Sequence, residues 1–171
     1  PLSQVDAAHS ALADLPEVHA LLVGAPLFGE EEKYAQKLHS LTERLGLSER
    51  VHFLGFRDDV PTLMAAVDVV VHASTAPEPF GRVIVEGMMA GTPVIATRAG
   101  GAQEIIDHEQ TGLLIPPDTP DALCNAIQRL IKAPDYAHKL ACTGREAALT
   151  HFTVESMVHR IQEEIEAATY S

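Results

Sequence analysis

The feature that most limits the fold of this chain is the regular alternation of short apolar runs with longer amphipathic runs. Apolar runs of strand length are separated by segments whose apolar residues recur at helical spacing. The expected strands are 18–23, 51–54, 68–72, 93–96 and 112–115, and the expected helices are 34–45, 59–67, 83–90, 103–106, 120–131, 135–149 and 154–165. The strands, 18–23 included, lack alternation of apolar and polar residues, so they are expected to be buried on both faces, which predicts an α/β fold with a doubly wound parallel sheet. Gly46 is expected to end the helix 34–45, and Thr153 to cap the last helix.

Length and charge narrow the class of protein. A chain of 171 residues suits a single domain, 1–171. Acidic residues outnumber basic ones 24 to 12, and the net charge of -12 argues against binding to nucleic acid or to an anionic membrane. No apolar run approaches the roughly 20 residues that span a bilayer. No basic and then apolar signal segment opens the chain, so a cytoplasmic location is expected.

Other reactive side chains receive structural interpretations. Cys124 and Cys142 lie in helical patterns and are expected to be buried free thiols. The nine histidines show no metal-binding spacing with a third ligand nearby, so no metal site is expected. His72 is expected to pack at the end of a strand, and Asp58 or Asp59 to cap a helix.

Ligands of doubly wound sheets bind beyond the carboxyl ends of the strands. That rule points to Gly24 and to the loops 55–57, 74–81 and 97–101.

The segment 78–86 carries the most chemistry. Glu78 lies in the loop after the third expected strand, and Phe80-Gly81 turns the chain into a helix. The amides of residues 82–84 are expected to point out of that helix and to form an anion site. With Glu86 expected in about the first turn, two carboxylates beside an anion site suit a ligand that has both phosphate and hydroxyl groups.

The alternative is that the two glutamates only offset the dipole of a surface helix. The neighbouring residues favour the ligand. Pro77 and Pro79 stiffen the loop. Gly87 and Gly91 are unfavourable inside a helix, which predicts close packing or a close backbone approach at these positions.

The same segment resembles glycosyltransferase family 4. The family pattern Glu-x-Phe-Gly-x4-Glu falls on Glu78, Phe80, Gly81 and Glu86, and is followed by Met89-Ala90-Gly91 and by Pro93–Ala96. The similarity extends over about residues 18–131, with further matches at 22–24, 53–56, 99–101 with Glu104, and 111–113. It implies a Rossmann-like domain, the C-terminal domain of a B-type (GT-B) glycosyltransferase fold.

The resemblance also implies roles for residues. Glu78 is expected to bind hydroxyls of the transferred sugar, and Glu86 to accept hydrogen bonds from both ribose hydroxyls. Backbone amides of Arg82 and Val83 are expected to hold the diphosphate. Phe56 and Arg57 are expected to contact the base. The remaining expected donor-binding residues are Gly24, Ser74, Phe80, Gly81 and the turn Gly100-Gly101, which is expected to sit close to the donor.

The implied activity is retaining transfer of a hexose from a nucleotide-diphosphate sugar to a saccharide or lipid acceptor, in polysaccharide or glycolipid biosynthesis. No cofactor is expected, and the absence of any Asp-x-Asp fits a metal-independent family. The alternatives are a catalytically silent nucleotide-binding module, a nucleotide-sugar epimerase, or a phosphorylase. A nicotinamide dehydrogenase is disfavoured, since no Gly-x-Gly-x-x-Gly follows a strand.

Compared with that family, the chain corresponds only to the second of two domains. The usual opening strand, with an arginine and a lysine that neutralise the diphosphate, has no counterpart, so a fragment is expected. The N-terminal acceptor-binding domain is the expected partner of the terminal helix 153–171, and any peripheral membrane contact is expected to run through that domain.

Overall fold

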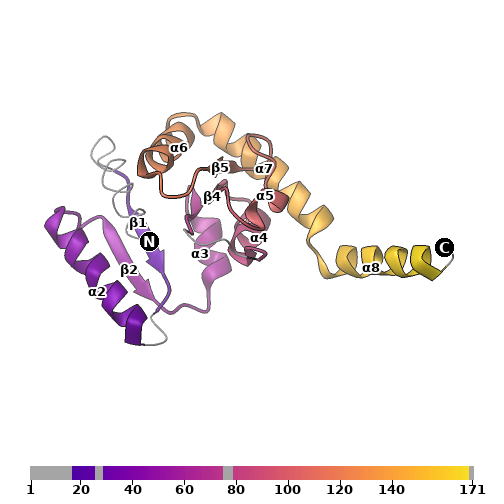
Figure 1. Ribbon diagram of the computed structural model, residues 1–171. Coiled ribbons are helices and arrows are strands. Elements are labelled where there is room, and N and C mark those ends of the chain that lie inside the picture. The colour runs from indigo at the N-terminus through magenta and orange to yellow at the C-terminus, as the bar shows by residue number, and fades with distance from the viewer. Residues whose placement is uncertain (1–16, 26–28, 75–78, 170–171) are drawn as a thin grey trace.

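The computed structural model describes residues 17–25, 29–74 and 79–169 (Figure 1). Strands and helices alternate up to the last strand, and helices follow it. The strands are β1 (Ala20–Val23), β2 (Val51–Gly55), β3 (Val70–His72), β4 (Val94–Thr97) and β5 (Leu113–Ile115). The helices are α2 (Gly29–Arg44), α3 (Val60–Ala66), α4 (Arg82–Met89), α5 (Ala102–Ile105), α6 (Pro120–Lys132), α7 (Pro134–His151) and α8 (Val154–Thr169). Every expected element is present, with shifted boundaries.

The strands are all parallel, but they pair in two separate sheets. β1 pairs with β2, while β3, β4 and β5 form a second sheet in that order. Within the described residues no ladder joins β1 to β3.

The three-stranded sheet is covered on both faces, as the apolar strands predict. Alternate residues of β4 enter different apolar clusters: Val94 and Ala96 face one, and Ile95 faces the other. The first cluster is closed by α3, α4, α5 and the end of α7, and the second by α6 and the beginning of α7. The doubly wound α/β fold is therefore confirmed.

The β1–β2 sheet is covered on one face only by the described residues. Leu38 and Leu41 of α2 pack against Leu22 and Phe53. On the opposite face Leu21 is 41% exposed. The expectation that residues 18–23 form a fully buried strand is therefore wrong for the described structure, because a single helix covers this sheet.

Glycine ends α2 as predicted. Gly46 has a φ of 67°, and the amides of Gly46 and Leu47 donate to the carbonyls of Glu43 and Thr42. This pair of bonds satisfies the last carbonyls of the helix and is the Schellman arrangement.

The cap of α8 is confirmed as well. Thr153 Oγ1 accepts from the Ser156 amide at 3.2 Å, and Ser156 Oγ accepts from the Thr153 amide at 3.1 Å. The chain bends at this cap, and α8 projects away from the body of the molecule (Figure 1).

The two cysteines differ from each other. Cys124 is buried in α6 as expected, but Cys142 is exposed on α7, with its sulfur 3.5 Å from His138 Nε2. The prediction of burial is wrong for Cys142, because its side of α7 lies outside both apolar clusters. In the described part of the chain, no helix is long and apolar enough to cross a membrane.

Candidate functional site

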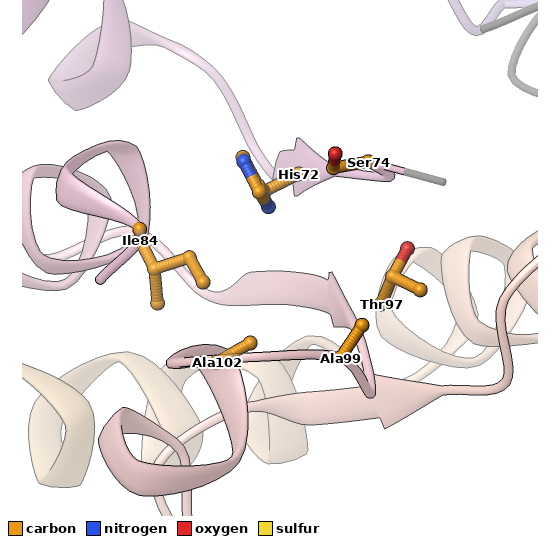
Figure 2. A pocket seen from close by; sticks show the side chains of 7 residues that line it. His72, Ser74, Ile84, Thr97, Ala99 and Ala102 are labelled. Atoms are coloured by element: carbon orange, nitrogen blue, oxygen red, sulfur yellow. The ribbon is translucent and has the colours of Figure 1, made fainter. Parts of the chain in front are cut away.

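A shallow pocket lies at the carboxyl ends of β3 and β4, where the sheet rule places ligands (Figure 2). It encloses about 200 Å³, including the solvent at its mouth. Residues from β3, α4, β4 and α5 surround it: His72, Ser74, Gly81, Ile84, Thr97, Ala99 and Ala102. Two of the expected donor-binding residues, Ser74 and Gly81, are therefore brought together here.

Helix α4 begins at the wall of this pocket. Gly81 is its N-cap residue and has a φ of 88°, a left-handed conformation that glycine adopts most easily. The Ile84 amide donates to the Gly81 carbonyl at 3.0 Å, so the expectation that it points freely out of the helix is wrong. The amides of Arg82 and Val83 have no acceptor within the helix, because they belong to its first turn, so they are the two amides left for the expected anion site.

Arg82 and Glu86 lie one turn apart on the surface of α4. The Arg82 Nε donates to Glu86 Oε1 at 3.2 Å, and the arginine side chain is 85% exposed. Glu86 is in the second turn of the helix, not the first as expected, because α4 starts at Arg82. An exposed pair of this kind is worth about 0–1 kcal/mol, so either group can exchange its partner for a ligand at little cost.

The turn Gly100-Gly101 contacts the loop that leads into α4. Gly100 has a φ of 54°. A Cβ on Gly101 would lie 2.5 Å from the Phe80 carbonyl oxygen and 2.8 Å from the Pro79 carbonyl oxygen. These two loops therefore pack backbone against backbone, which requires glycine at position 101 even when no ligand is bound.

The two glycines that were expected inside this helix, Gly87 and Gly91, have different structural roles. A Cβ on Gly87 would lie 3.0 Å from Val94 and 3.1 Å from Val70, so the predicted close packing is confirmed there. Gly91 lies beyond the helix with a φ of 78°, and the amides of Gly91 and Thr92 donate back to the last turn. The packing interpretation is wrong for Gly91, since this residue ends the helix.

A second group of expected donor-binding residues lies at the end of the β1–β2 sheet. The Gly24 amide donates to the Gly55 carbonyl at 2.9 Å, and Phe56 follows with 79% of its surface exposed. Arg57 Nε and Nη2 donate to the two carboxylate oxygens of Asp59 at 2.7 and 2.6 Å.

The Asp59 carboxylate pairs with Arg57 and does not cap α3. The carboxylate occupies the N-cap position of α3 but makes no cap hydrogen bond there, so the capping prediction is wrong. The hydrogen bonds from Arg57 hold the pKa of the Asp59 carboxyl below its ordinary value. The same bonds raise the pKa of Arg57.

The expected site residues thus fall into two groups. Ser74, Gly81 and Ile84 of the first turn of α4 line the same pocket, and the Phe80 backbone packs against Gly101. Gly24, Phe56 and Arg57, at the end of the β1–β2 sheet, are not among the described residues that line the pocket. The expected sugar-binding residue Glu78 lies outside the described residues.

Sequence reasoning assigned no ligand role to several residues of the pocket. His72 was expected only to pack, yet it lines the pocket as well as ending β3. Ile84 was predicted only to supply a backbone amide, Ala99 was included only as part of the loop 97–101, and Ala102 was not predicted, because apolar side chains carry no chemical signal. Position in the fold was the only signal for Thr97, which ends β4 at the predicted ligand edge.

Comparison with known proteins agrees with this geometry. The family described as Glycosyl transferases group 1 matches residues 3–147. The lipopolysaccharide core biosynthesis glycosyltransferase LpsE of Rhizobium meliloti (strain 1021) is 36% identical over 147 residues, which cover 86% of this chain and 41% of LpsE.

Solved structures extend the comparison. Anabaena HepE in complex with UDP and glucose is 43% identical with a TM-score of 0.88, over 96% of this chain and 44% of HepE. The C-terminal domain of a glycosyl transferase group 1 family protein (LpcC) from Francisella tularensis is 27% identical with a TM-score of 0.82, over 89% of this chain and 78% of that domain.

The chain spans less than half the length of LpsE and HepE. Its α/β architecture, with parallel sheets flanked by helices, is that of a GT-B glycosyltransferase domain. The family match covers most of the sequence and includes both the pocket and the start of α4. The chain belongs to the group 1 family of glycosyl transferases.

Proposed function

We propose that this chain is the donor-binding half of a retaining glycosyltransferase of family 4 that uses a nucleotide-diphosphate sugar. The observation that carries the proposal is the start of α4: Gly81, its N-cap residue, lines a pocket at the carboxyl edge of the sheet, the amides of Arg82 and Val83 follow directly, and Glu86 lies one turn further along the helix. A second structure of HepE, solved in complex with UDP-glucose, supports the choice of ligand class.

In the proposed complex the amides of Arg82 and Val83 bind the diphosphate at the helix N-terminus. Glu86 accepts hydrogen bonds from the ribose hydroxyls. The exposed Arg82 guanidinium leaves Glu86 and turns to the diphosphate, so that one weak ion pair is replaced by two ligand contacts. Negative charge that develops on the leaving diphosphate is stabilised by these donors.

The base and the sugar occupy the two sides of that anion site. Phe56 and Arg57 contact the base, partly through backbone groups, and the exposed Phe56 ring is suited to that contact. Glu78, which follows Ser74 in the sequence and precedes α4, binds hydroxyls of the sugar. The acceptor hydroxyl attacks the face of the sugar from which the diphosphate departs, and the enzyme acts mainly by positioning both reactants.

Titration of the chain with UDP, GDP and ADP tests donor binding directly. We expect selective binding of one of them and a loss of about tenfold or more in Glu86→Ala, because hydrogen bonds to a charged group contribute about 1.5–3 kcal/mol each. Glu146→Ala, which removes an exposed glutamate from α7, is the matched control. Equal affinities of wild type and Glu86→Ala would contradict the assigned role.

Sugar transfer is a property of the whole enzyme, and its test uses the longer protein. There we expect Glu78→Ala to lower the rate of transfer more than it lowers the affinity for the nucleoside diphosphate. The same protein, screened against nucleotide sugars, identifies base and sugar. Base exchange without an acceptor would instead indicate an epimerase, and dependence on free phosphate a phosphorylase.

The coverage of the relatives favours a second candidate for the chain by itself, a nucleotide-binding module without catalytic activity. Nucleotide binding with no transfer of sugar by the isolated chain is the expected result. A cytoplasmic location, a metal-independent reaction and a place in polysaccharide or glycolipid biosynthesis are part of the same proposal. Measuring sugar transfer in the presence of a metal chelator tests metal independence, and we expect the activity to be retained.

A further inference from the structure

Two aromatic rings connect the donor-site loop to the junction between the last two helices. Phe80 directly precedes the N-cap glycine of α4, and its ring is 48% exposed. The ring of Phe152 meets it edge-on, with 6.0 Å between the centroids and 67° between the planes. Edge-to-face pairs with this spacing contribute about 0.5–1.5 kcal/mol beyond the area that they bury.

Phe152 is held in place independently of Phe80. It is the C-cap residue of α7, and its amide donates to the Ala148 carbonyl at 3.0 Å. Its side chain packs against the apolar cluster that includes the buried face of α4. The next residue, Thr153, is fixed by the reciprocal cap of α8. Phe152 therefore provides a rigid surface for the more exposed Phe80 ring.

The loop is also restrained by another part of the fold. The backbone of Pro79 and Phe80 lies against Gly101, which has no room for a Cβ. Contacts from the β4–α5 turn and from Phe152 thus restrain the chain one residue before Gly81. Since Gly81 starts α4, a shift of Phe80 moves the amides of the first turn, which are the proposed ligands of the diphosphate.

We propose that Phe152 is a positioning residue of the donor site: through Phe80 it holds the entrance to α4 in the conformation that binds the diphosphate. This inference rests on the proposed function for its consequence in ligand binding. The restraint on the loop itself is a property of the ligand-free chain, so it can be measured without any nucleotide.

The first test is amide hydrogen exchange of the ligand-free chain. The Ile84 amide, which donates to the Gly81 carbonyl, reports on the first turn of α4. In Phe152→Ala we expect its exchange to be about two- to tenfold faster, relative to amides of α6, as the loss of one aromatic pair predicts. The matched control is Tyr136→Ala, which truncates a partly buried aromatic residue of the opposite apolar cluster. An unchanged relative rate at Ile84 overturns the inference.

The second test is titration with the nucleoside diphosphate that wild type binds. We expect Phe152→Ala to weaken binding by about two- to tenfold, Phe152→Tyr to restore it, and Phe152→Leu to lie between them. In a cycle with Phe80→Ala the losses should not add. Equal affinity of Phe152→Ala and wild type overturns the inference. Wild type that binds no nucleotide refutes the proposed function instead, while the exchange test still decides the restraint on the loop.

Discussion

Replacing Gly101 by alanine separates two explanations for a glycine next to the proposed donor site. The added Cβ would lie 2.5 Å from the Phe80 carbonyl oxygen and 2.8 Å from both the Phe80 Cα and the Pro79 carbonyl oxygen. All three are backbone atoms, so no side-chain rotation relieves the clash. The φ of Gly101 is −61°, which alanine adopts freely, so the whole effect is steric.

The expected loss of stability follows from that geometry. Overpacking of this kind costs about 1–3 kcal/mol, and in a chain of this size 1 kcal/mol lowers the Tm by about 2–4 °C. We therefore expect Gly101→Ala to melt several degrees below wild type without any ligand. Displacement of the Pro79-Phe80 backbone should also weaken nucleoside diphosphate binding, measured by titration.

A suitable control is Gly46→Ala at the end of α2. Its Cβ meets nothing within 4 Å, but its φ of 67° is unfavourable for alanine. It should lose about 1–2 kcal/mol of stability from backbone strain and keep the nucleotide affinity of wild type. If Gly101→Ala is as stable as wild type and loses only nucleotide binding, the packing argument is refuted, and space for the ligand is the reason for the glycine.

Three further substitutions or conditions test the packing, capping and charge assignments. Gly87→Ala should lower the free energy of unfolding by about 1–3 kcal/mol, seen as a lower urea midpoint, because the added Cβ would lie 3.0 Å from the Val94 side chain and 3.1 Å from that of Val70. Thr153→Ala should cost about 0.5–2 kcal/mol and destabilise α8 first, measured by exchange of the Ser156 amide. The Asp59 pKa is lowered by Arg57, so its contribution to stability is present above the ordinary pKa of an aspartate and is lost as the pH falls through the lowered value. The acid-unfolding curve of Asp59→Asn should therefore approach that of wild type at low pH.

The sequence predicted those features that depend on local patterns. Helical spacing located the helices, and Gly46 and Thr153 marked ends that the structure confirms. Pairing between distant strands has no local signal, so the division into two sheets was not foreseen. The role of Asp59 was also ambiguous in the sequence, because an aspartate before a helix can cap it or can pair with a nearby cation. In the structure it pairs with Arg57.

The sequence named residues of the candidate site but did not predict how they are arranged in space. The motif identified Gly81, Arg82 and Glu86, but the exact start of α4 determined which amides remain available and put Glu86 just beyond the first turn. The sequence predicted that Gly101 lies close to the donor, and the structure adds a second reason for glycine there, since backbone atoms of another loop occupy the place of a Cβ. Phe152 belongs to no motif, and its contact with Phe80 is visible only in three dimensions.

The two separate sheets have a consequence for the lifetime of the donor site. A unit of two strands and one helix is marginally stable by itself, whereas the three-stranded sheet is enclosed on both faces. The β1–α2–β2 unit should therefore open as its own cooperative unit, at a lower free energy than the rest of the described chain. Phe56 is carried on this less stable unit, and Glu86 on the more stable one. The proposed base subsite should thus open and close many times while the proposed subsite for the ribose and diphosphate stays folded.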